Sequence, residues 1–264
     1  MVVAPSRGGN FWPTLARTAD SFHVVWSNED GDSEDLYLRK LNAKLEPEGE
    51  IARLTDMAQT GGNKPRARVP WMGVANDALF IGYRLERDPE HLIELMRLPI
   101  ADATKGLPPA AKTAPRVDRT VGEVVLVNAD RAKSDSPAVV CSGPGCFLVW
   151  HGESGGGASA AFVDASAPKP QALWRKKFSK LGGDPSVAVA SSGEAQIVWY
   201  ERGVIMTASI GRDGVGIASK VARISGDQPM PSLAPGAKAG EWLLAWLDFE
   251  AGHLEPYAAR VTCK

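Results

Sequence analysis

A short apolar run that ends in an aromatic residue recurs five times along this chain of 264 residues. The aromatic residues that end the runs stand 57, 67, 49 and 47 residues apart. Runs rich in Val, Ile and aromatic residues, bounded by glycines and polar turns, are typical of buried β-strands. A period of this length indicates that one supersecondary unit is used repeatedly. The runs are Phe22–Trp26, Leu79–Tyr83, Cys146–Trp150, Ala195–Trp199 and Trp242–Trp246.

A second signal lies upstream of each run, where Gly or Ser is followed by Asn or Asp and then by a nearby proline. An Asx side chain can bond the backbone two residues further on, and proline restricts the residue before it to extended geometry. The signal therefore predicts a turn that opens a strand. Its Asx residues are Asn10, Asn63, Asp135, Asp184 and Asp227.

Two more strands are predicted after each run. In the first unit they are Leu36–Leu41 and Glu50–Thr55, and in the fourth unit Val204–Ile210 and Lys220–Ser225. Each unit is thus expected to form a four-stranded antiparallel meander. A meander repeated in this way resembles the blade of a β-propeller, a likeness to the superfamily and to no single family within it. The resemblance implies an all-β fold, most simply a five-bladed propeller.

The repeat predicts a single propeller domain over residues 1–264, with blades at about 10–56, 63–130, 135–180, 184–225 and 227–262. The fifth unit stops after its third strand, at Tyr257–Thr262. Residues 2–6 precede the first Asx signal as Val221–Ser225 precedes the last one. We therefore expect residues 2–6 to supply the missing outer strand and close the ring. The alternative is that the chain is part of a larger propeller.

A carboxylate lies just past each aromatic residue, in the loop after that strand. In a meander blade this loop shares a face with the loop that carries the Asx signal, so loops of every blade converge there on a rigid scaffold. We expect this face to bind a protein or a carbohydrate, and solvated turn charges are the alternative interpretation. The predicted ligand-binding residues are Glu29, Glu86, Glu153, Glu201, Asp248, Asn10, Asn63, Asp135, Asp184 and Asp227.

Charge and motifs argue against several other functions. The formal net charge of −1 is unsuited to a nucleic-acid surface, and the apolar runs are too short for membrane insertion. The four histidines lack the spacing of a metal-binding pair, so no metal is expected. No phosphate-cradling loop and no nucleophile elbow occur, so no cofactor is predicted.

The first strands of the predicted blades, such as Ala138–Val140 and Ser186–Val189, carry no acidic residue. Glycoside hydrolysis needs two carboxyl groups that flank the scissile bond. We therefore expect a non-enzymatic binding or scaffold module. The alternative is a five-bladed glycoside-hydrolase-like enzyme in which the loop carboxylates Asp135, Asp184 and Asp227 reach the central funnel.

Cys141 and Cys146 flank the turn sequence Ser-Gly-Pro-Gly, which places the two thiols across the mouth of a hairpin. A disulfide and a pair of buried thiols both agree with the sequence, because the redox compartment decides between them. A disulfide would favour an extracellular or periplasmic location.

Overall fold

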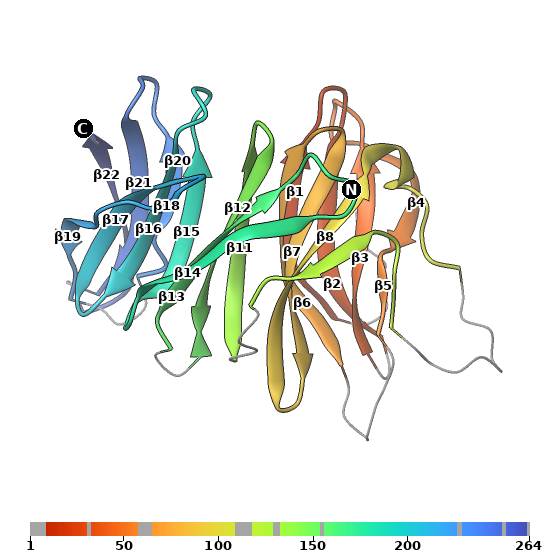
Figure 1. Cartoon of the computed structure of the whole chain (residues 1–264), viewed down its shortest axis with the longest axis horizontal. Helices are drawn as coiled ribbons and strands as arrows, with labels where there is room; N and C mark the ends of the chain where they lie inside the picture. Colours follow the sequence, from red (N-terminus) through yellow and green to blue (C-terminus); the bar gives the residue numbers. More distant parts are fainter. Residues whose placement is uncertain are drawn as a thin grey trace.

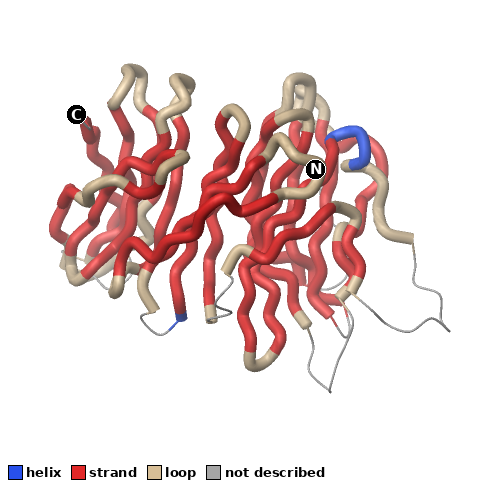
Figure 2. The backbone as a smooth tube through the Cα atoms, viewed as in Figure 1, coloured by secondary structure: helices blue, strands red, loops and turns tan. Residues whose placement is uncertain are grey.

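The fold is built almost entirely of strands, as the repeat predicts. The computed structural model describes residues 9–30, 33–57, 65–108, 118–128, 133–153, 156–225, 229–249 and 252–262. Within these ranges the helical content is a 3₁₀ turn at Ile100–Asp102 and the 3₁₀ position Glu153 (Figure 2). No helix in the described part of the chain has the length and apolar character needed to span a bilayer. The all-β prediction is confirmed.

The strands form five antiparallel meanders that follow one another along the chain, and one parallel pair, Glu34 with Arg66, joins the first two meanders into a single sheet. The first contains β1 (Gly9–Arg17), β2 (Phe22–Asp30), β3 (Ser33–Leu41) and β4 (Pro47–Arg53). The second contains β6 (Arg66–Ala75), β7 (Ala78–Arg87), β8 (Glu90–Pro99) and β10 (Glu123–Leu126). The third contains β11 (Ser134–Ser142), β12 (Gly145–Gly152), β13 (Ala158–Asp164) and β14 (Gln171–Ser179).

The fourth meander contains β15 (Gly183–Val189), β16 (Ala195–Glu201), β17 (Val204–Gly211) and β19 (Ser219–Arg223), with the short β18 (Gly214–Val215). The fifth contains β20 (Ser232–Pro235), β21 (Glu241–Asp248) and β22 (Glu255–Thr262). Two short strands, β5 (Thr55–Asp56) and β9 (Arg119–Thr120), pair with each other and link the first two meanders.

The meanders are arranged as the blades of a β-propeller. Figure 1 shows them in chain order, from the red strands on the right to the blue strands on the left. The first strand of each meander lies beside the first strand of the next, in the series β1, β6, β11, β15 and β20. These strands therefore line the inner side of the molecule, and the propeller prediction is confirmed. The pairing predicted for residues 2–6 lies outside the described residues.

Apolar clusters fill the spaces between neighbouring meanders. Three of the aromatic residues that end the apolar runs are at most 5% exposed and pack toward the preceding meander. They are Tyr83, Trp150 and Trp199. Among the described residues, the cluster between the first two meanders contains 17 buried side chains. The cluster between the last two contains only three, Val198, Ile205 and Leu244. Because burial of apolar area is the main stabilising term, the fifth meander is the least firmly attached.

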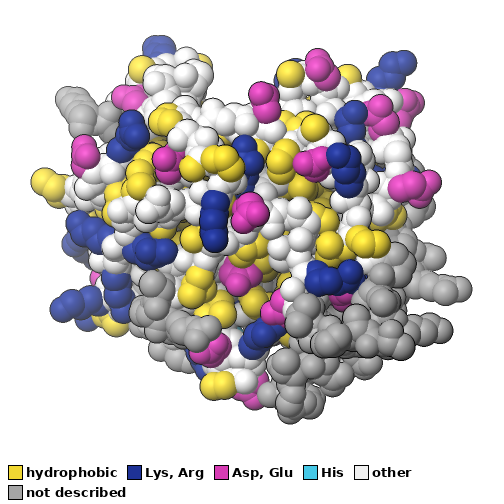
Figure 3. Space-filling model, turned by 45° about the vertical axis from the view of Figure 1, so that its right-hand side comes forward, with side chains coloured by type: hydrophobic (Ala, Val, Ile, Leu, Met, Phe, Trp, Pro, Cys, Tyr) yellow, Lys and Arg dark blue, Asp and Glu magenta, His cyan; other side chains and the backbone are white. Residues whose placement is uncertain are grey.

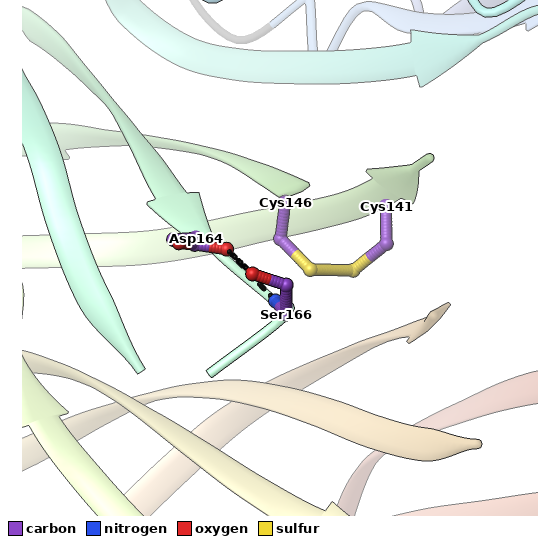
Figure 4. Close-up of a disulfide and its surroundings, with 4 residues drawn as sticks. All are labelled: Cys141, Cys146, Asp164 and Ser166. Atoms are coloured by element: carbon purple, nitrogen blue, oxygen red, sulfur yellow. Dashed lines mark hydrogen bonds between the residues drawn. A yellow bond between two sulfur atoms is a disulfide. The ribbon is translucent and has the colours of Figure 1, made fainter. Parts of the chain in front are cut away.

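A disulfide closes the first hairpin of the third meander. Cys141 and Cys146 face each other in the register of β11 and β12, with an S–S distance of 2.05 Å (Figure 4). Asp164 lies nearby and accepts hydrogen bonds from the N–H and the hydroxyl of Ser166, which lower the pKa of the Asp164 carboxyl. The disulfide lies at the end of β11 away from Asp135, so it fixes the hairpin at the opposite end from that residue.

Candidate functional site

The inner strands share an unusual backbone step near their starts. In every meander one residue adopts a left-handed conformation, with φ between 43° and 49°, and proline follows it directly. A left-handed backbone is unfavourable for any residue with a Cβ and most of all for a β-branched one. Such strain persists where the surrounding structure imposes it, often at functional sites. The five residues are Trp12, Val69, Ser136, Asp184 and Met230.

All five left-handed residues line one pocket of about 400 Å³, which we call the axial pocket. Every meander therefore contributes to it through the same step of its inner strand. The backbone step interrupts the strand register and brings these residues to the pocket. The lining residues are Trp12, Val69, Trp71, Arg84, Asp135, Ser136, Pro137, Ala138, Asp184, Pro185, Ser186, Met230, Pro231 and Ser232.

Two carboxylates from neighbouring meanders reach the axial pocket. Asp135 contacts the guanidinium of Arg84, and its Oδ1 accepts hydrogen bonds from the N–H and hydroxyl of Ser136 at 2.6 and 3.2 Å. Asp184 donates its peptide N–H to Nδ1 of His151 at 3.3 Å, and its Oδ1 lies 3.8 Å from the same nitrogen. The two side chains are 28% and 38% exposed, so both are accessible to a ligand.

An ion-pair network supports one side of the pocket. Arg84 contacts both Asp135 and Glu86, and Glu86 Oε1 also lies 3.2 Å from Arg68 Nη1. Arg68 Nε lies 2.9 Å from Glu34 Oε2, and burial raises the pKa of this glutamate. The network runs from the buried Glu34 to the pocket, so it holds both guanidinium groups in place.

Apolar side chains face the remaining space. Trp12 and Trp71 are 39% and 41% exposed, and Met230 is 63% exposed. The guanidinium of Arg68 lies 4.5 Å from the centre of the Trp12 ring, close enough for a cation–π contact. Neither tryptophan ends one of the apolar runs, so the repeat gave no reason to select them. Their signal in the sequence is that each directly adjoins a proline near the start of an inner strand.

The predicted site residues divide into two groups. Asp135 and Asp184 meet in the axial pocket. The lining of the axial pocket does not include the predicted residues Glu29, Glu86, Glu153, Glu201, Asp248 and Asn10. Asn63 and Asp227 lie outside the described residues. In the second and fifth meanders the structural counterparts of the Asp184–Pro185 step are Val69–Pro70 and Met230–Pro231, because each combines a left-handed residue with the proline that follows it.

The acids outside the pocket have local partners. Glu201 accepts hydrogen bonds from the Ser179 hydroxyl and Trp199 Nε1, and Asp248 accepts two from Ser225. Glu153 contacts His91 of the preceding meander. Asn10 Oδ1 accepts a hydrogen bond from Asn28 at 2.9 Å, and Glu29 is half-buried on β2.

The charge on the molecular surface is mixed. On the face shown in Figure 3, basic, acidic and apolar side chains alternate, and neither charge gathers into a large patch. This distribution agrees with the near-zero net charge. Among the described residues no group of three or more His, Cys, Asp or Glu side chains is placed to hold a metal ion.

No protein-family model and no curated protein sequence matches this chain. Among solved structures, the endosialidase of phage phi92 is similar with a TM-score of 0.62 and 9% identity, over 97% of this chain and 58% of that one. The sialidase of Trypanosoma rangeli is similar with a TM-score of 0.56 and 11% identity, over 96% of this chain and 47% of that one. A third similar structure is Zg3597, a family 117 glycoside hydrolase from the marine bacterium Zobellia galactanivorans. Its TM-score is 0.52 and its identity 10%, over 95% of this chain and 83% of that one.

At these identities the likeness shows the fold, and the chain spans about half the length of the two sialidases. The likeness also corrects the expected function. We expected a non-enzymatic binding or scaffold module. This expectation is contradicted, because the similar structures are glycoside hydrolases and sialidases. The physical reason lies in Asp135 and Asp184. The inner strands lack acids along their middles, yet the steps at their starts bring two carboxylates to the pocket.

Proposed function

We propose that this chain is a glycoside-hydrolase-like enzyme that acts on a carbohydrate bound in the axial pocket. The observation that carries the proposal is that one pocket is lined by two acidic residues, Asp135 and Asp184, and by two exposed tryptophans. Most glycoside hydrolases cleave the glycosidic bond with two carboxyl groups that lie on opposite sides of it. The glycosidases and sialidases among the similar structures support the same class of chemistry.

The surroundings of the two carboxylates suggest different roles. A general acid must hold a proton before it gives it to the leaving oxygen, and a neighbouring guanidinium opposes this. Asp184 has no guanidinium partner among the described residues, so we assign it as the general acid. Asp135 is held by Arg84 and Ser136, and this pairing suits a carboxylate that works in its ionised form.

The reaction then adds water across the bond. Asp184 gives its proton to the leaving glycosidic oxygen as the bond to the anomeric carbon breaks. In an inverting course Asp135 takes a proton from the water whose oxygen bonds to that carbon, and in a retaining course Asp135 bonds to the carbon first and water releases it. The anomeric form of the first product, read by nuclear magnetic resonance, distinguishes the two courses.

The tryptophans supply the binding surface. One face of many sugar rings carries C–H groups and is apolar, so it packs on an aromatic ring while the hydroxyls keep polar partners. Trp12 and Trp71 come from neighbouring meanders, and the hydroxyls of Ser136, Ser186 and Ser232 line the same pocket. This mixture of a few polar groups with an apolar lining is typical of small-molecule sites.

The test is hydrolysis of a panel of oligosaccharides and aryl glycosides. With a substrate found in this way, Asp135→Asn and Asp184→Asn should each lower kcat by about 10²- to 10⁴-fold. Asp213→Asn, an exposed aspartate in the turn between β17 and β18, is the matched control and should retain full activity. Melting curves of all three variants separate lost chemistry from lost folding. Full activity in both pocket variants, or no hydrolysis of any member of a broad panel, would contradict the proposal.

A further inference from the structure

The axial pocket offers no unpaired cation among its described lining residues. Its lining cation is Arg84, whose side chain is only 10% exposed and contacts two carboxylates, Glu86 and Asp135. Arg68, the second guanidinium beside the pocket, also lies between two carboxylates, Glu34 and Glu86. A ligand anion would have to displace one of these existing partners to reach either arginine.

Asp184 adds a second carboxyl group to the lining, and no guanidinium group pairs with it among the described residues. Nδ1 of His151 accepts the peptide N–H of Asp184 at 3.3 Å and lies 3.8 Å from Asp184 Oδ1. The pocket and the network behind it thus hold more carboxylates than guanidinium groups. A sugar carboxylate or sulfate would meet repulsion there, because clefts lined by one sign of charge disfavour ligands of the same sign.

The rest of the lining suits a ligand without charge. Trp12, Trp71 and Met230 are the most exposed large apolar side chains of the pocket, and they face a space that three serines and five left-handed backbone steps also border. Such a lining favours ligands with apolar ring faces and hydroxyl groups, and among its described residues Arg84 is the one cationic side chain.

We infer that the axial pocket selects uncharged glycosides and excludes sugars that carry a carboxylate or a sulfate. The inference rests on the proposed function and adds the class of substrate to it. It assigns Glu86 as a positioning residue that sets this specificity, since its carboxylate occupies Arg68 and Arg84 at the same time.

Glu86 therefore provides the decisive variant. In Glu86→Gln each arginine keeps one carboxylate, Glu34 for Arg68 and Asp135 for Arg84, and gains free N–H donors. The variant should bind acidic sugars that the natural chain rejects. Glu123→Gln is the matched control, because Glu123 is exposed on β10 of the same meander and lies outside the pocket lining.

The experiment uses a glycan array printed with neutral, carboxylated and sulfated forms of the same oligosaccharides. The best neutral glycan and its acidic counterpart are then titrated while tryptophan fluorescence is recorded. We expect the natural chain to bind the neutral form at least about tenfold more tightly, a ratio that corresponds to about 1.4 kcal/mol. Glu86→Gln should narrow this ratio, and Glu123→Gln should leave it unchanged.

Tighter binding of acidic glycans by the natural chain overturns the inference while the proposed function stands. Equal ratios in Glu86→Gln and the Glu123→Gln control also overturn it. Binding of no glycan at all overturns the proposed function itself, so the two failures are distinguishable.

Discussion

Asp248 of the fifth meander accepts two hydrogen bonds from Ser225 at the end of the fourth, one from the peptide N–H at 2.9 Å and one from the hydroxyl at 2.7 Å. Glu201 of the fourth meander accepts a bond of 2.6 Å from Ser179 of the third in the same way. In these two meanders the acid that follows the aromatic residue therefore ties its meander to the preceding one. This contact matters most for the fifth meander, whose apolar cluster is the smallest.

The change Asp248→Ala should therefore loosen the fifth meander. Hydrogen bonds to a charged acceptor contribute about 1.5–3 kcal/mol, so we expect a loss of about 2 kcal/mol in the free energy of unfolding. Hydrogen exchange should accelerate first in β20, β21 and β22. Asp213→Ala at an exposed turn serves as the control. An unfolding curve and an exchange pattern equal to those of the control would show that the contact with Ser225 contributes nothing.

The change Trp199→Ala tests the packing role of the aromatic residues. Trp199 is 2% exposed and packs edge-on against Phe178, so its removal empties a large site in the third cluster. We expect a loss of about 3–5 kcal/mol. Trp71→Ala is the matched comparison, because Trp71 is exposed in the pocket and should affect carbohydrate capture with little change in melting. Unchanged melting of Trp199→Ala together with a strongly lowered melting temperature of Trp71→Ala would contradict both the packing role of Trp199 and the binding role of Trp71.

Much of the fold could be predicted because each strand signal is local. The run Cys146–Trp150 lies within β12, and Leu36–Leu41 lies within β3, since alternating apolar residues and turn glycines act over a few residues.

The site was only half predictable. Asp135 and Asp184 were selected because an Asx residue with a nearby proline is a visible signal. Val69–Pro70 was missed because Asn63 and Pro65 carry the same signal earlier in the chain. The spacing in the sequence is a better guide. In every meander a proline stands 13 to 15 residues before the aromatic residue that ends the next apolar run. These prolines are Pro13, Pro70, Pro137, Pro185 and Pro231. The role of Arg84 could not be predicted, because its partners come from two meanders.

A pH effect is expected from His23. This histidine is fully buried, and neither ring nitrogen has a hydrogen-bond partner. Burial, with a smaller contribution from Lys40, lowers its pKa below the ordinary 6.5. The pH-dependent penalty of burying this ring is therefore absent above pH 6.5 and grows as the pH falls toward the folded pKa, because the unfolded chain binds the proton more readily than the folded one.

The change His23→Phe should remove this acid sensitivity. Phe80 and Phe147 occupy the same position of their runs, so the blade accommodates a phenyl ring there. We expect a gain of about 1 kcal/mol at pH 7.5, from the loss of unsatisfied polar atoms, and a larger gain at pH 5. Thermal melting at the two pH values measures it, with His253→Phe at an exposed position as the control. A gain that does not grow at pH 5 would count against the argument.

We propose that residues 1–264 form a single propeller domain whose ring is closed by residues 2–6 at β22. Deletion of residues 1–8 should then leave a strand edge unpaired, lower the melting temperature and promote aggregation. Substitution of Val2 and Val3 by serine keeps the chain length and is the milder comparison. Unchanged melting of the deleted chain would show that the last meander is completed in another way.

The last prediction concerns the strain at the axial pocket. Val69 is half-buried, and its φ of 49° places a β-branched residue in the left-handed region. Glycine adopts this region freely, at the expense of a more flexible unfolded chain. The series Val69→Ala and Val69→Gly should therefore raise the melting temperature stepwise, with a net gain of up to about 1 kcal/mol for glycine. Carbohydrate binding should weaken in the same order, because the side chain borders the pocket.

Val187 provides the matched series. It is 3% exposed on β15 and is absent from the residues with positive φ, so Val187→Ala and Val187→Gly remove apolar contacts without relieving strain. Melting temperature should fall along this series while it rises along the first. If both series fall together, the left-handed conformation of Val69 stores no strain, and the five backbone steps then shape the pocket without opposing the stability of the fold.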